Sequence, residues 1–159
     1  MKEKEKKDNP LITTHHEARH YYEIFETLEA GIVLVGCEVK SLREAQASLA
    51  GSFARFEGTD LVIQNLYIAP YPQGNRENPD PRRLRKLLLH KSQMEKLRTR
   101  MQEKGLSIIP LKMYFNPRGI AKIELGTARS KKLRDQRSDI KERDIKREID
   151  RAVKNRNRK

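Results

Sequence analysis

Residues 106–125 read LSIIPLKMYFNPRGIAKIEL and consist of two apolar runs separated by Asn116-Pro117-Arg118-Gly119. The separating residues favour turns, and the flanking runs have the length and composition of strands. We therefore predict an antiparallel hairpin, with strands over residues 106–115 and 120–125. This hairpin indicates a fold built mainly from antiparallel strands.

Three further regions extend this pattern toward the N-terminus. Residues 53–56 and 61–68 flank the turn formers Glu57-Gly58-Thr59-Asp60, which predicts another hairpin. Residues 20–29 alternate apolar and polar positions, as a half-buried strand does. Residues 85–90, RKLLLH, suit either a strand or a helix, and we favour a strand because a new helix start follows them.

Two helices are predicted among these strands. In residues 38–47, the i, i+3 spacing of Val39 and Leu42 predicts a short helix that places both side chains on the core. Residues 92–105 begin with a serine followed three positions later by Glu95, the capping-box pair, and end at a glycine suited to a left-handed cap. The sequence thus predicts a mainly β fold: an OB-like closed antiparallel barrel with two or three short helices and a basic C-terminal tail, because closure removes exposed sheet edges.

Composition divides the chain into three parts. Residues 1–17 are expected to be a flexible N-terminal segment, since the first ten residues are too polar to pack. Residues 18–128 hold all nine aromatic residues and form the barrel. Residues 129–159 form the tail; from residue 127 onward there are fourteen Lys/Arg, six Asp/Glu and no Gly, Pro or aromatic residue. Such a segment cannot build a core, so we expect it to be disordered alone and helical against a polyanion.

The chain has 159 residues, a formal charge of +13 and a pI near 10.0. Nucleic acid is the first partner to consider, because counterion release favours a cationic protein on a phosphate backbone, and an anionic membrane is a weaker candidate. No apolar run approaches the ~20 residues of a membrane span and no signal peptide is visible, so we expect a soluble, cytoplasmic protein. The single cysteine, Cys37, excludes an intramolecular disulfide, and the four histidines lack metal-ligand spacing, so no metal or cofactor is expected.

More specific information lies in four segments: EAGIVLVGCEVKSLR (29–43), NLYIAPY (65–71), DPRRLRKLLLHK (80–91) and, within 108–132, IIPLKMYFN-RGIAKIELGTARSKK. In this order, ahead of a basic tail, they resemble the SsrA-binding protein family, also called small protein B or SmpB. The resemblance implies a barrel that binds the elbow of the tRNA-like domain of transfer-messenger RNA. It also implies trans-translation, the rescue of ribosomes stalled on messages without a stop codon, with the tail in the vacant decoding centre and mRNA channel against small-subunit rRNA. We therefore expect a non-enzymatic adaptor that acts as a monomer.

Candidate RNA-binding residues in the barrel follow from the same resemblance. Glu29 matches a family glutamate at the RNA contact; an acid facing RNA in a cationic protein has to accept hydrogen bonds from base edges, and a solvated strand end is the alternative. Leu88 matches a second family position linked to RNA contact; the alternative is that it is a core leucine of a buried strand. The neighbouring basic residues are either RNA contacts or a solubilising face. The full set is His20, Glu29, Arg82, Arg85, Lys86, Leu88, Lys131 and Lys132.

The tail has a thin apolar stripe, in which Ile145, Ile149 and Val153 repeat at i, i+4 and i+8. Opposite-charge i, i+4 pairs contribute only about 0.2–0.5 kcal/mol each, too little to offset the cost of helix nucleation. The tail helix is therefore expected to depend on the ribosome. Tail residues expected at the ribosome are Arg134, Asp135, Arg137, Lys141, Arg143, Ile145, Lys146 and Ile149.

Two other functions stay open at this point. A ribosomal or initiation-type OB protein that binds rRNA or tRNA directly would explain the charge and the fold, but not the EVKSLR and RKLLL segments. A small nuclease would need paired acids, or a histidine with an acid, and the barrel region has no DxD, HxH or nucleophile motif. Three positions also depart from the family pattern: Ser130 replaces a glycine, Gln136 a lysine and His15 an asparagine.

Overall fold

The structure, a computed structural model, describes residues 10–156. In this part of the chain the elements follow in the order β1 (Leu11–Thr14), α1 (Ala18–Tyr21), β2 (Tyr22–Ile32), α2 (Gly36–Arg43), β3 (Ala47–Ser48), β4 (Phe53–Glu57), β5 (Asp60–Gln64), β6 (Tyr67–Ile68), the 3-10 helix η1 (Pro72–Glu77), β7 (Arg85–Leu88), α3 (Lys91–Lys104), β8 (Ser107–Phe115), β9 (Ala121–Ser130) and α4 (Leu133–Arg156). The mainly β class predicted from the sequence is confirmed.

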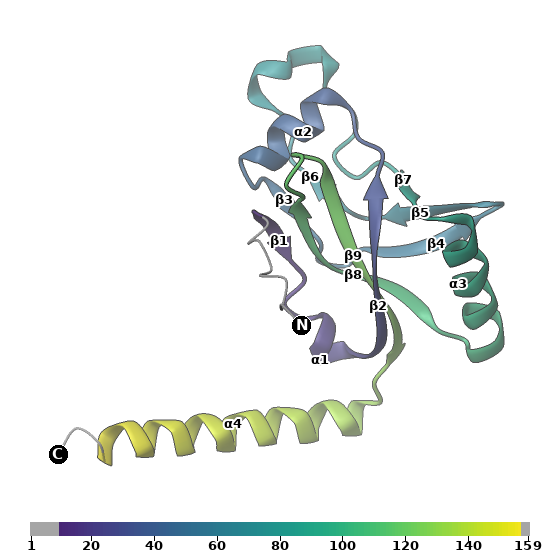
Figure 1. Cartoon of the computed structure of the whole chain (residues 1–159). Coiled ribbons are helices and arrows are strands. Elements are labelled where there is room, and N and C mark those ends of the chain that lie inside the picture. The colour runs from purple at the N-terminus through teal and green to yellow at the C-terminus, as the bar shows by residue number, and fades with distance from the viewer. Residues whose placement is uncertain (1–9, 157–159) are drawn as a thin grey trace, which may run out of the picture.

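Seven strands form one antiparallel sheet in the order β1-β8-β4-β5-β7-β2-β9 (Figure 1). The last strand of this order, β9, also pairs with the second, β8. The pairing therefore returns to β8 and joins six strands in a ring, with β1 added at β8. Two ladders in this ring are short: β4 meets β8 at Ala54↔Ile108, and β2 meets β7 at two pairs that begin with Gly31↔Leu88. Two junctions of this ring are thus narrow contacts rather than full-length ladders, so the closed barrel predicted from the sequence is only weakly closed at these points.

The hairpin predicted around Asn116 to Gly119 is confirmed as β8–β9. The N–H of Asn116 donates to the carbonyl of Ile120 at 2.9 Å, and the side-chain oxygen of Asn116 accepts from the N–H of Arg118 at 3.0 Å. Gly119 has φ +75°, a left-handed conformation that glycine adopts without steric cost. Strand β9 extends five residues further than predicted, to Ser130, because its second half pairs with β2 along most of that strand.

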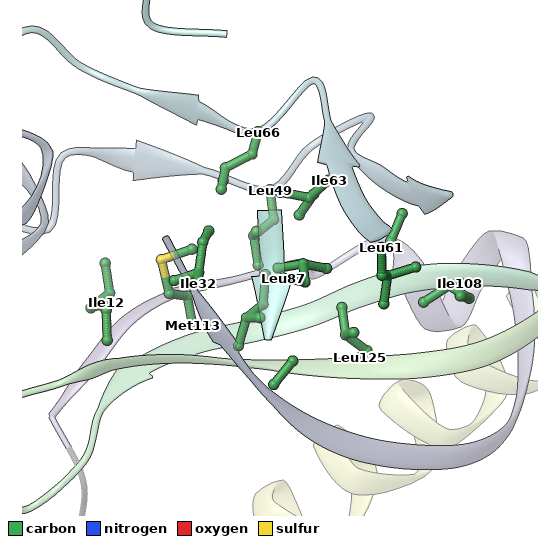
Figure 2. Close-up of a cluster of buried hydrophobic side chains, with 14 of the residues drawn as sticks. Ile12, Ile32, Leu49, Leu61, Ile63, Leu66, Leu87, Ile108, Met113 and Leu125 are labelled. Carbon is green, nitrogen blue, oxygen red and sulfur yellow. The ribbon is translucent and has the colours of Figure 1, made fainter. Parts of the chain in front are cut away.

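Apolar side chains from the barrel strands fill its interior (Figure 2). The alternation along β7 decides which residues point inward: Arg85 and Leu87 are buried, whereas Lys86 and Leu88 are exposed. Burying one large aliphatic side chain contributes about 1.5–3 kcal/mol, so this cluster supplies the main stabilisation of the barrel. Fully buried members from different elements include Leu42, Leu61, Ile63, Leu87, Ile108, Met113, Ile123 and Leu125.

Two helix predictions need correction. The predicted capping box of Ser92 and Glu95 is wrong, because the helix begins at Lys91; the side-chain oxygen of Gln93 accepts the N–H of His90 at 3.3 Å instead. Gly105 ends this helix with φ +58°, as predicted. In α2 the residues buried against the barrel are Glu38, Ser41 and Leu42, so an acid takes the inward position expected for Val39.

The N-terminal boundary of the sheet also differs from the prediction. Residues 11–14, placed in the flexible segment 1–17, form β1 and pair with β8 in a ladder that includes Leu11↔Tyr114. They enter the sheet because Ile12 is buried in the core cluster. Residues 18–21 form α1, so the strand predicted from residue 20 starts at Tyr22. The remainder of the predicted flexible segment, residues 1–9, lies outside the described residues.

The C-terminal segment forms α4, which projects away from the barrel as one long helix (Figure 1). No side chain of residues 133–155 is buried. The start of the helix is tied to α1, since the N–H of Lys131 donates to the carbonyl of Tyr21 at 2.8 Å. Dependence of this helix on the ribosome stays a prediction. Within residues 10–156, no helix is long and apolar enough to cross a membrane.

Candidate nucleic-acid interface

Strands β7, β2, β9 and β8 place one row of residues side by side on their outer surface. The register aligns Leu88 with Gly31, Gly31 with Lys122, and Lys122 with Tyr114. Residues directly opposite one another in antiparallel strands point to the same face. Gly31 contributes no side chain, and a Cβ there would lie 3.2 Å from the Cβ of Leu88. We call the surface made by Glu29, Leu88, Lys112, Tyr114, Lys122 and Glu124 the outer sheet face.

Glu29 lies on the outer sheet face with 51% of its side chain exposed. The hydroxyl of Tyr114 donates a hydrogen bond to one carboxylate oxygen, and the ammonium of Lys122 lies 3.8 Å from the other. Burial raises the pKa of Tyr114, and the hydrogen bond and charge of Glu29 raise it further. The tyrosine hydroxyl therefore keeps its proton and acts as the hydrogen-bond donor to Glu29. A carboxylate held in this way can accept further hydrogen bonds from the edge of a nucleobase.

Acids and lysines alternate around this position. Glu29 is directly opposite Glu124 in the β2–β9 ladder, an arrangement of like charges that destabilises a sheet on its own. Lys112 offsets it by pairing with Glu124 at 3.0 Å, and the same ammonium lies 5.7 Å from the centre of the Tyr114 ring. Lys112, Tyr114 and Lys122 were not predicted from the sequence as neighbours of Glu29. The alternation along 112, 114 and 122, 124 in the predicted hairpin was the available signal.

Three of the predicted RNA-binding residues on or before β7 reach the surface. Leu88 is 51% exposed, so the alternative of a buried core leucine is wrong. Lys86, two residues earlier, points to the same side and pairs with Asp60 at 2.8 Å. The guanidinium of Arg82 is exposed and lies 5.3 Å from the centre of the Tyr67 ring.

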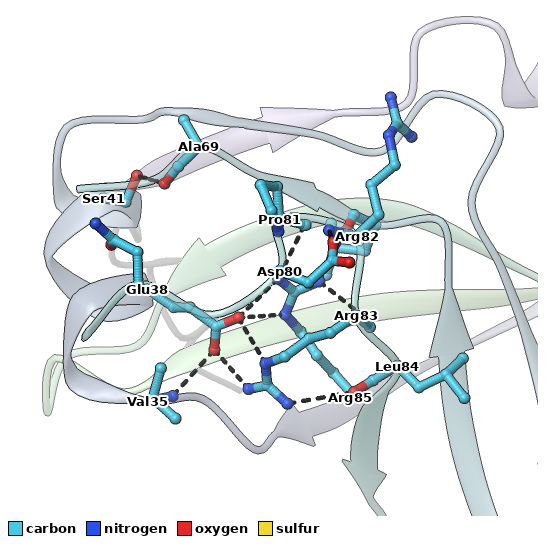
Figure 3. A network of polar contacts seen from close by, with 12 residues as sticks. Val35, Glu38, Ser41, Ala69, Asp80, Pro81, Arg82, Arg83, Leu84 and Arg85 are labelled. Carbon is cyan, nitrogen blue, oxygen red and sulfur yellow. Dashed lines mark hydrogen bonds and ion pairs between the residues drawn. The ribbon is translucent and has the colours of Figure 1, made fainter. Parts of the chain in front are cut away.

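Arg85 requires a correction, because it is buried to 1% exposure and points into the protein (Figure 3). Its guanidinium donates to the carboxylate of Glu38 at 2.8 Å and to the carbonyls of Leu66, Pro81 and Arg83 at 2.7, 3.0 and 3.2 Å. With these donors engaged, Arg85 cannot contact RNA from this position. The β7 alternation that exposes Lys86 is the physical reason.

Glu38 is the centre of this buried network and was not identified from the sequence. Besides Arg85, it accepts two hydrogen bonds from Arg83, at 3.0 and 2.6 Å, and one from the N–H of Val35 at 3.0 Å. Burial alone would raise the pKa of Glu38, but the hydrogen bonds from Arg83, Val35 and Arg85 outweigh it and hold the pKa below its ordinary value. The network joins α2 to β7, so it positions the strand that carries Lys86 and Leu88. Its sequence signal was the i, i+4 spacing of Glu38 and Leu42 on one helix face.

The remaining barrel candidates lie at the start of the tail. His20 is half-buried, packs edge-on against Tyr21 and has a buried Nδ1 without a hydrogen-bond partner among the described residues. Lys131 is largely engaged, since its ammonium donates to the carbonyl of Arg19 at 3.1 Å and pairs with Asp139. Lys132 is exposed. The structure therefore separates these residues from the outer sheet face and gathers them near α1.

All eight predicted tail residues are exposed on α4: Arg134, Asp135, Arg137, Lys141, Arg143, Ile145, Lys146 and Ile149. The exposed apolar side chains Ile145, Ile149 and Val153 follow one another at helical spacing, with no barrel surface covering them.

Among residues 10–156, no group of three His, Cys, Asp or Glu could hold a metal ion. The surface thus offers hydrogen-bonding, cationic and apolar groups suited to RNA.

Comparison with known proteins gives consistent matches over most of the chain. The family model described as SmpB protein matches residues 12–155. An SsrA-binding protein of Pelotomaculum thermopropionicum is 53% identical over 148 residues, which are 93% of this chain and 96% of the relative. That of Thermus thermophilus is 51% identical over 139 residues, 87% of this chain and 96% of the relative.

A solved structure matches as well. It is described as "tmRNA-SmpB: a journey to the center of the bacterial ribosome", is 56% identical in sequence and superposes with a TM-score of 0.65. The match covers 78% of this chain and 86% of the other. At this identity, both fold and family are shared.

Proposed function

The chain belongs to the SmpB protein family, and from this we propose that it is a non-enzymatic, cytoplasmic adaptor for transfer-messenger RNA. It binds the tRNA-like domain of that RNA and delivers it to stalled ribosomes for trans-translation. The proposed partners are transfer-messenger RNA and the ribosome, which appear in the names of its relatives and of the solved complex.

The observation that carries the proposal at the level of residues is the position of Glu29. It is an exposed acid held by Tyr114, flanked by Lys122 and close to the exposed Leu88. A solvated strand-end glutamate needs no buried tyrosine to orient it. A carboxylate aimed outward among lysines suits looped RNA, whose unstacked bases present hydrogen-bonding edges, while lysines contact the phosphates.

The contact set we propose in the barrel is Glu29, Lys86, Leu88 and Arg82, with Lys112, Tyr114 and Lys122 added and Arg85 removed. His20, Lys131 and Lys132 form a second group where the barrel meets α4. The eight exposed tail residues named above would contact the ribosome, with α4 in the vacant mRNA channel. The fourteen Lys/Arg from residue 127 onward support this placement, because rRNA is polyanionic.

A gel-shift comparison tests the proposal. The full-length protein should bind the isolated tRNA-like domain more tightly than it binds an ordinary tRNA at the same salt concentration. Addition of the protein and transfer-messenger RNA to stalled ribosomes should then produce tagged nascent chains. Equal affinity for both RNAs would favour direct rRNA or tRNA binding instead, and degradation of either RNA would favour a nuclease.

A further inference from the structure

A pocket distinct from the outer sheet face lies between the C-terminal half of α3 and the β2–β9 ladder. Its volume is about 530 Å³, within the range of ~300–1,000 Å³ common for ligand sites. None of its residues belongs to the candidate set derived from the family resemblance. The lining residues are Phe25, Glu26, Arg100, Lys104, Leu106, Thr127 and Arg129.

Phe25 is held at the mouth of this pocket by an irregularity in β2. The register passes from Ile24↔Ala128 to Glu26↔Thr127, so Phe25 is the extra residue of a β-bulge. Its ring is 51% exposed, although it stands in a strand whose other apolar side chains point to the core. Bulges commonly redirect a side chain next to a functional site.

The charges around the ring are predominantly positive. The guanidinium of Arg129 lies 5.6 Å from the centre of the Phe25 ring. Arg100 pairs with Glu26, whereas neither Lys104 nor Arg129 has an ion pair within residues 10–156. The pocket therefore holds an exposed aromatic ring, Phe25, next to the planar guanidinium of Arg129. Its single acid, Glu26, pairs with Arg100, so the charges of Lys104 and Arg129 are not neutralised within the pocket.

We propose that this pocket binds one unpaired nucleotide of a structured RNA, with the base on Phe25 and Arg129 and the phosphate at Lys104 and Arg100. Aromatic rings and guanidinium planes are the groups on which proteins stack unpaired bases, and neighbouring cations track the backbone. This proposal rests on the proposed function, which brings the protein to two RNAs.

The pocket lies close along the chain to the two regions already described. Phe25 precedes Glu29 by four residues, about 13 Å along a strand. Arg129 precedes Lys131 by two residues, at the exit from the barrel into the tail. Glu26 and Thr127 share the face of Leu28 and Leu125, so the pocket lies on the side of the β2–β9 ladder opposite to Glu29. It can therefore hold a nucleotide that the outer sheet face does not contact. The RNA at this point is either transfer-messenger RNA or rRNA, which share the chemistry of an unpaired nucleotide.

A fluorescence titration tests the pocket directly, because the chain contains no tryptophan. Phe25→Trp keeps an aromatic face and introduces a single reporter. Its emission should be quenched by the tRNA-like domain if the nucleotide belongs to that RNA, or by stalled ribosomes without transfer-messenger RNA if it belongs to rRNA. Tyr71→Trp, in the loop before η1, controls for non-specific quenching.

Removal of the ring supplies the affinity test. Phe25→Leu keeps an apolar side chain and should weaken binding to the RNA that quenches the reporter by about 5- to 150-fold, the loss typical of one stacked base. Phe25→Trp should restore the affinity, and Lys104→Gln should lower the salt dependence by about one counterion. Unchanged melting of these variants excludes a structural cause.

The outcomes separate this proposal from the function it rests on. One set of results would overturn the pocket proposal alone. In it, the wild-type protein binds both RNAs, Phe25→Leu binds each of them as tightly as the wild type does, and the emission of Phe25→Trp is not quenched. Wild-type protein that binds neither the tRNA-like domain nor ribosomes overturns the proposed function and the pocket with it.

Discussion

The hydroxyl of Tyr114 on β8 donates a hydrogen bond to the carboxylate of Glu29 on β2, across the intervening strand β9. Tyr114 is 8% exposed, whereas about half of the Glu29 side chain is accessible. A buried group thus fixes the orientation of an exposed one. Glu29 is therefore oriented before any RNA binds, which lowers the entropy cost of forming hydrogen bonds to a base.

Reversing the charge of Glu29 should abolish this recognition. Glu29→Arg is expected to weaken binding to the tRNA-like domain by more than about tenfold, since it removes an acceptor that base edges require. Tyr114→Phe keeps the ring and removes only the orienting hydroxyl, so a smaller loss of about 1 kcal/mol in binding is expected. Gel shifts measure both effects and circular dichroism checks the fold. An unchanged dissociation constant for folded Glu29→Arg would refute the assignment.

Two adjacent leucines of β7 should separate binding from stability. Leu88→Ala removes an exposed side chain, so it should weaken RNA binding while changing the free energy of unfolding by about 0.5 kcal/mol or less. Leu87→Ala, its matched control, empties a core position and should destabilise by about 2–5 kcal/mol. Urea titration and gel shifts on both variants make the comparison. The reverse pattern would show that Leu88 is a packing residue.

The buried Glu38–Arg85 pair should be a major determinant of stability. Glu38→Gln keeps the shape of the side chain but leaves the buried guanidinium without its counter-charge, which should cost about 3–5 kcal/mol. Glu124→Gln, which breaks the partly exposed pair with Lys112, should cost under about 1 kcal/mol. Similar losses in the two variants would contradict a special role for the buried pair.

The same carboxylate predicts a pH dependence. The pKa of Glu38 is lower in the folded protein than its ordinary value, so its charge stabilises the fold above the unfolded-state pKa of about 4.3. That contribution is lost as the pH falls through the lower folded-state pKa. The difference in stability between wild type and Glu38→Gln should therefore shrink below about pH 4. Urea titrations at neutral, mildly acidic and more strongly acidic pH measure it, and a constant difference would contradict this linkage.

Sequence periodicity predicted the strands whose two faces differ, because alternation reports which side is buried. It located the β8–β9 hairpin, but it did not reveal which basic residues of β7 point inward, so Arg85 was not recognised as a core residue. An arginine enters a core only when a distant partner satisfies it, and Glu38 is 47 residues away. The Tyr114–Glu29 contact spans 85 residues and was invisible for the same reason. The boundary of β1 was missed because a single buried residue, Ile12, decides it.

Truncation after Lys132 should separate RNA binding from tagging. The barrel retains its core, since no side chain of residues 133–155 is buried, so the melting temperature should stay nearly constant. Binding to the tRNA-like domain should fall only modestly, through the loss of long-range charge. Tagging of a stalled nascent chain should fall to background. Normal tagging by the truncated protein would show that α4 is only a solubilising extension.

Helix formation in the tail can be tested by one residue. Ile149→Pro should abolish tagging and spare RNA binding by the barrel, because proline inside a helix costs about 3 kcal/mol. Ile149→Ala removes the apolar contact but keeps the helix, so it separates loss of helix from loss of contact. Amide exchange of the free protein should show little protection over residues 139–153 and clear protection on the ribosome. A free tail already protected would contradict the coupled folding mechanism.

Because α4 is long, a small change in orientation at its anchor, Lys131, moves its far end by a large distance. Once the tail is helical along its whole length, as it is expected to be on the ribosome, its 24 residues extend about 36 Å from the barrel. A rotation of about 10° at the anchor therefore displaces the far end by ~6 Å, more than the rise of a full helical turn. The ion pair of Lys131 with Asp139 and its contact with the carbonyl of Arg19 thus limit the arc swept by the distal basic residues. The two contacts of Lys131 at the barrel therefore determine the direction of α4, and with it the position of side chains about seven helical turns away.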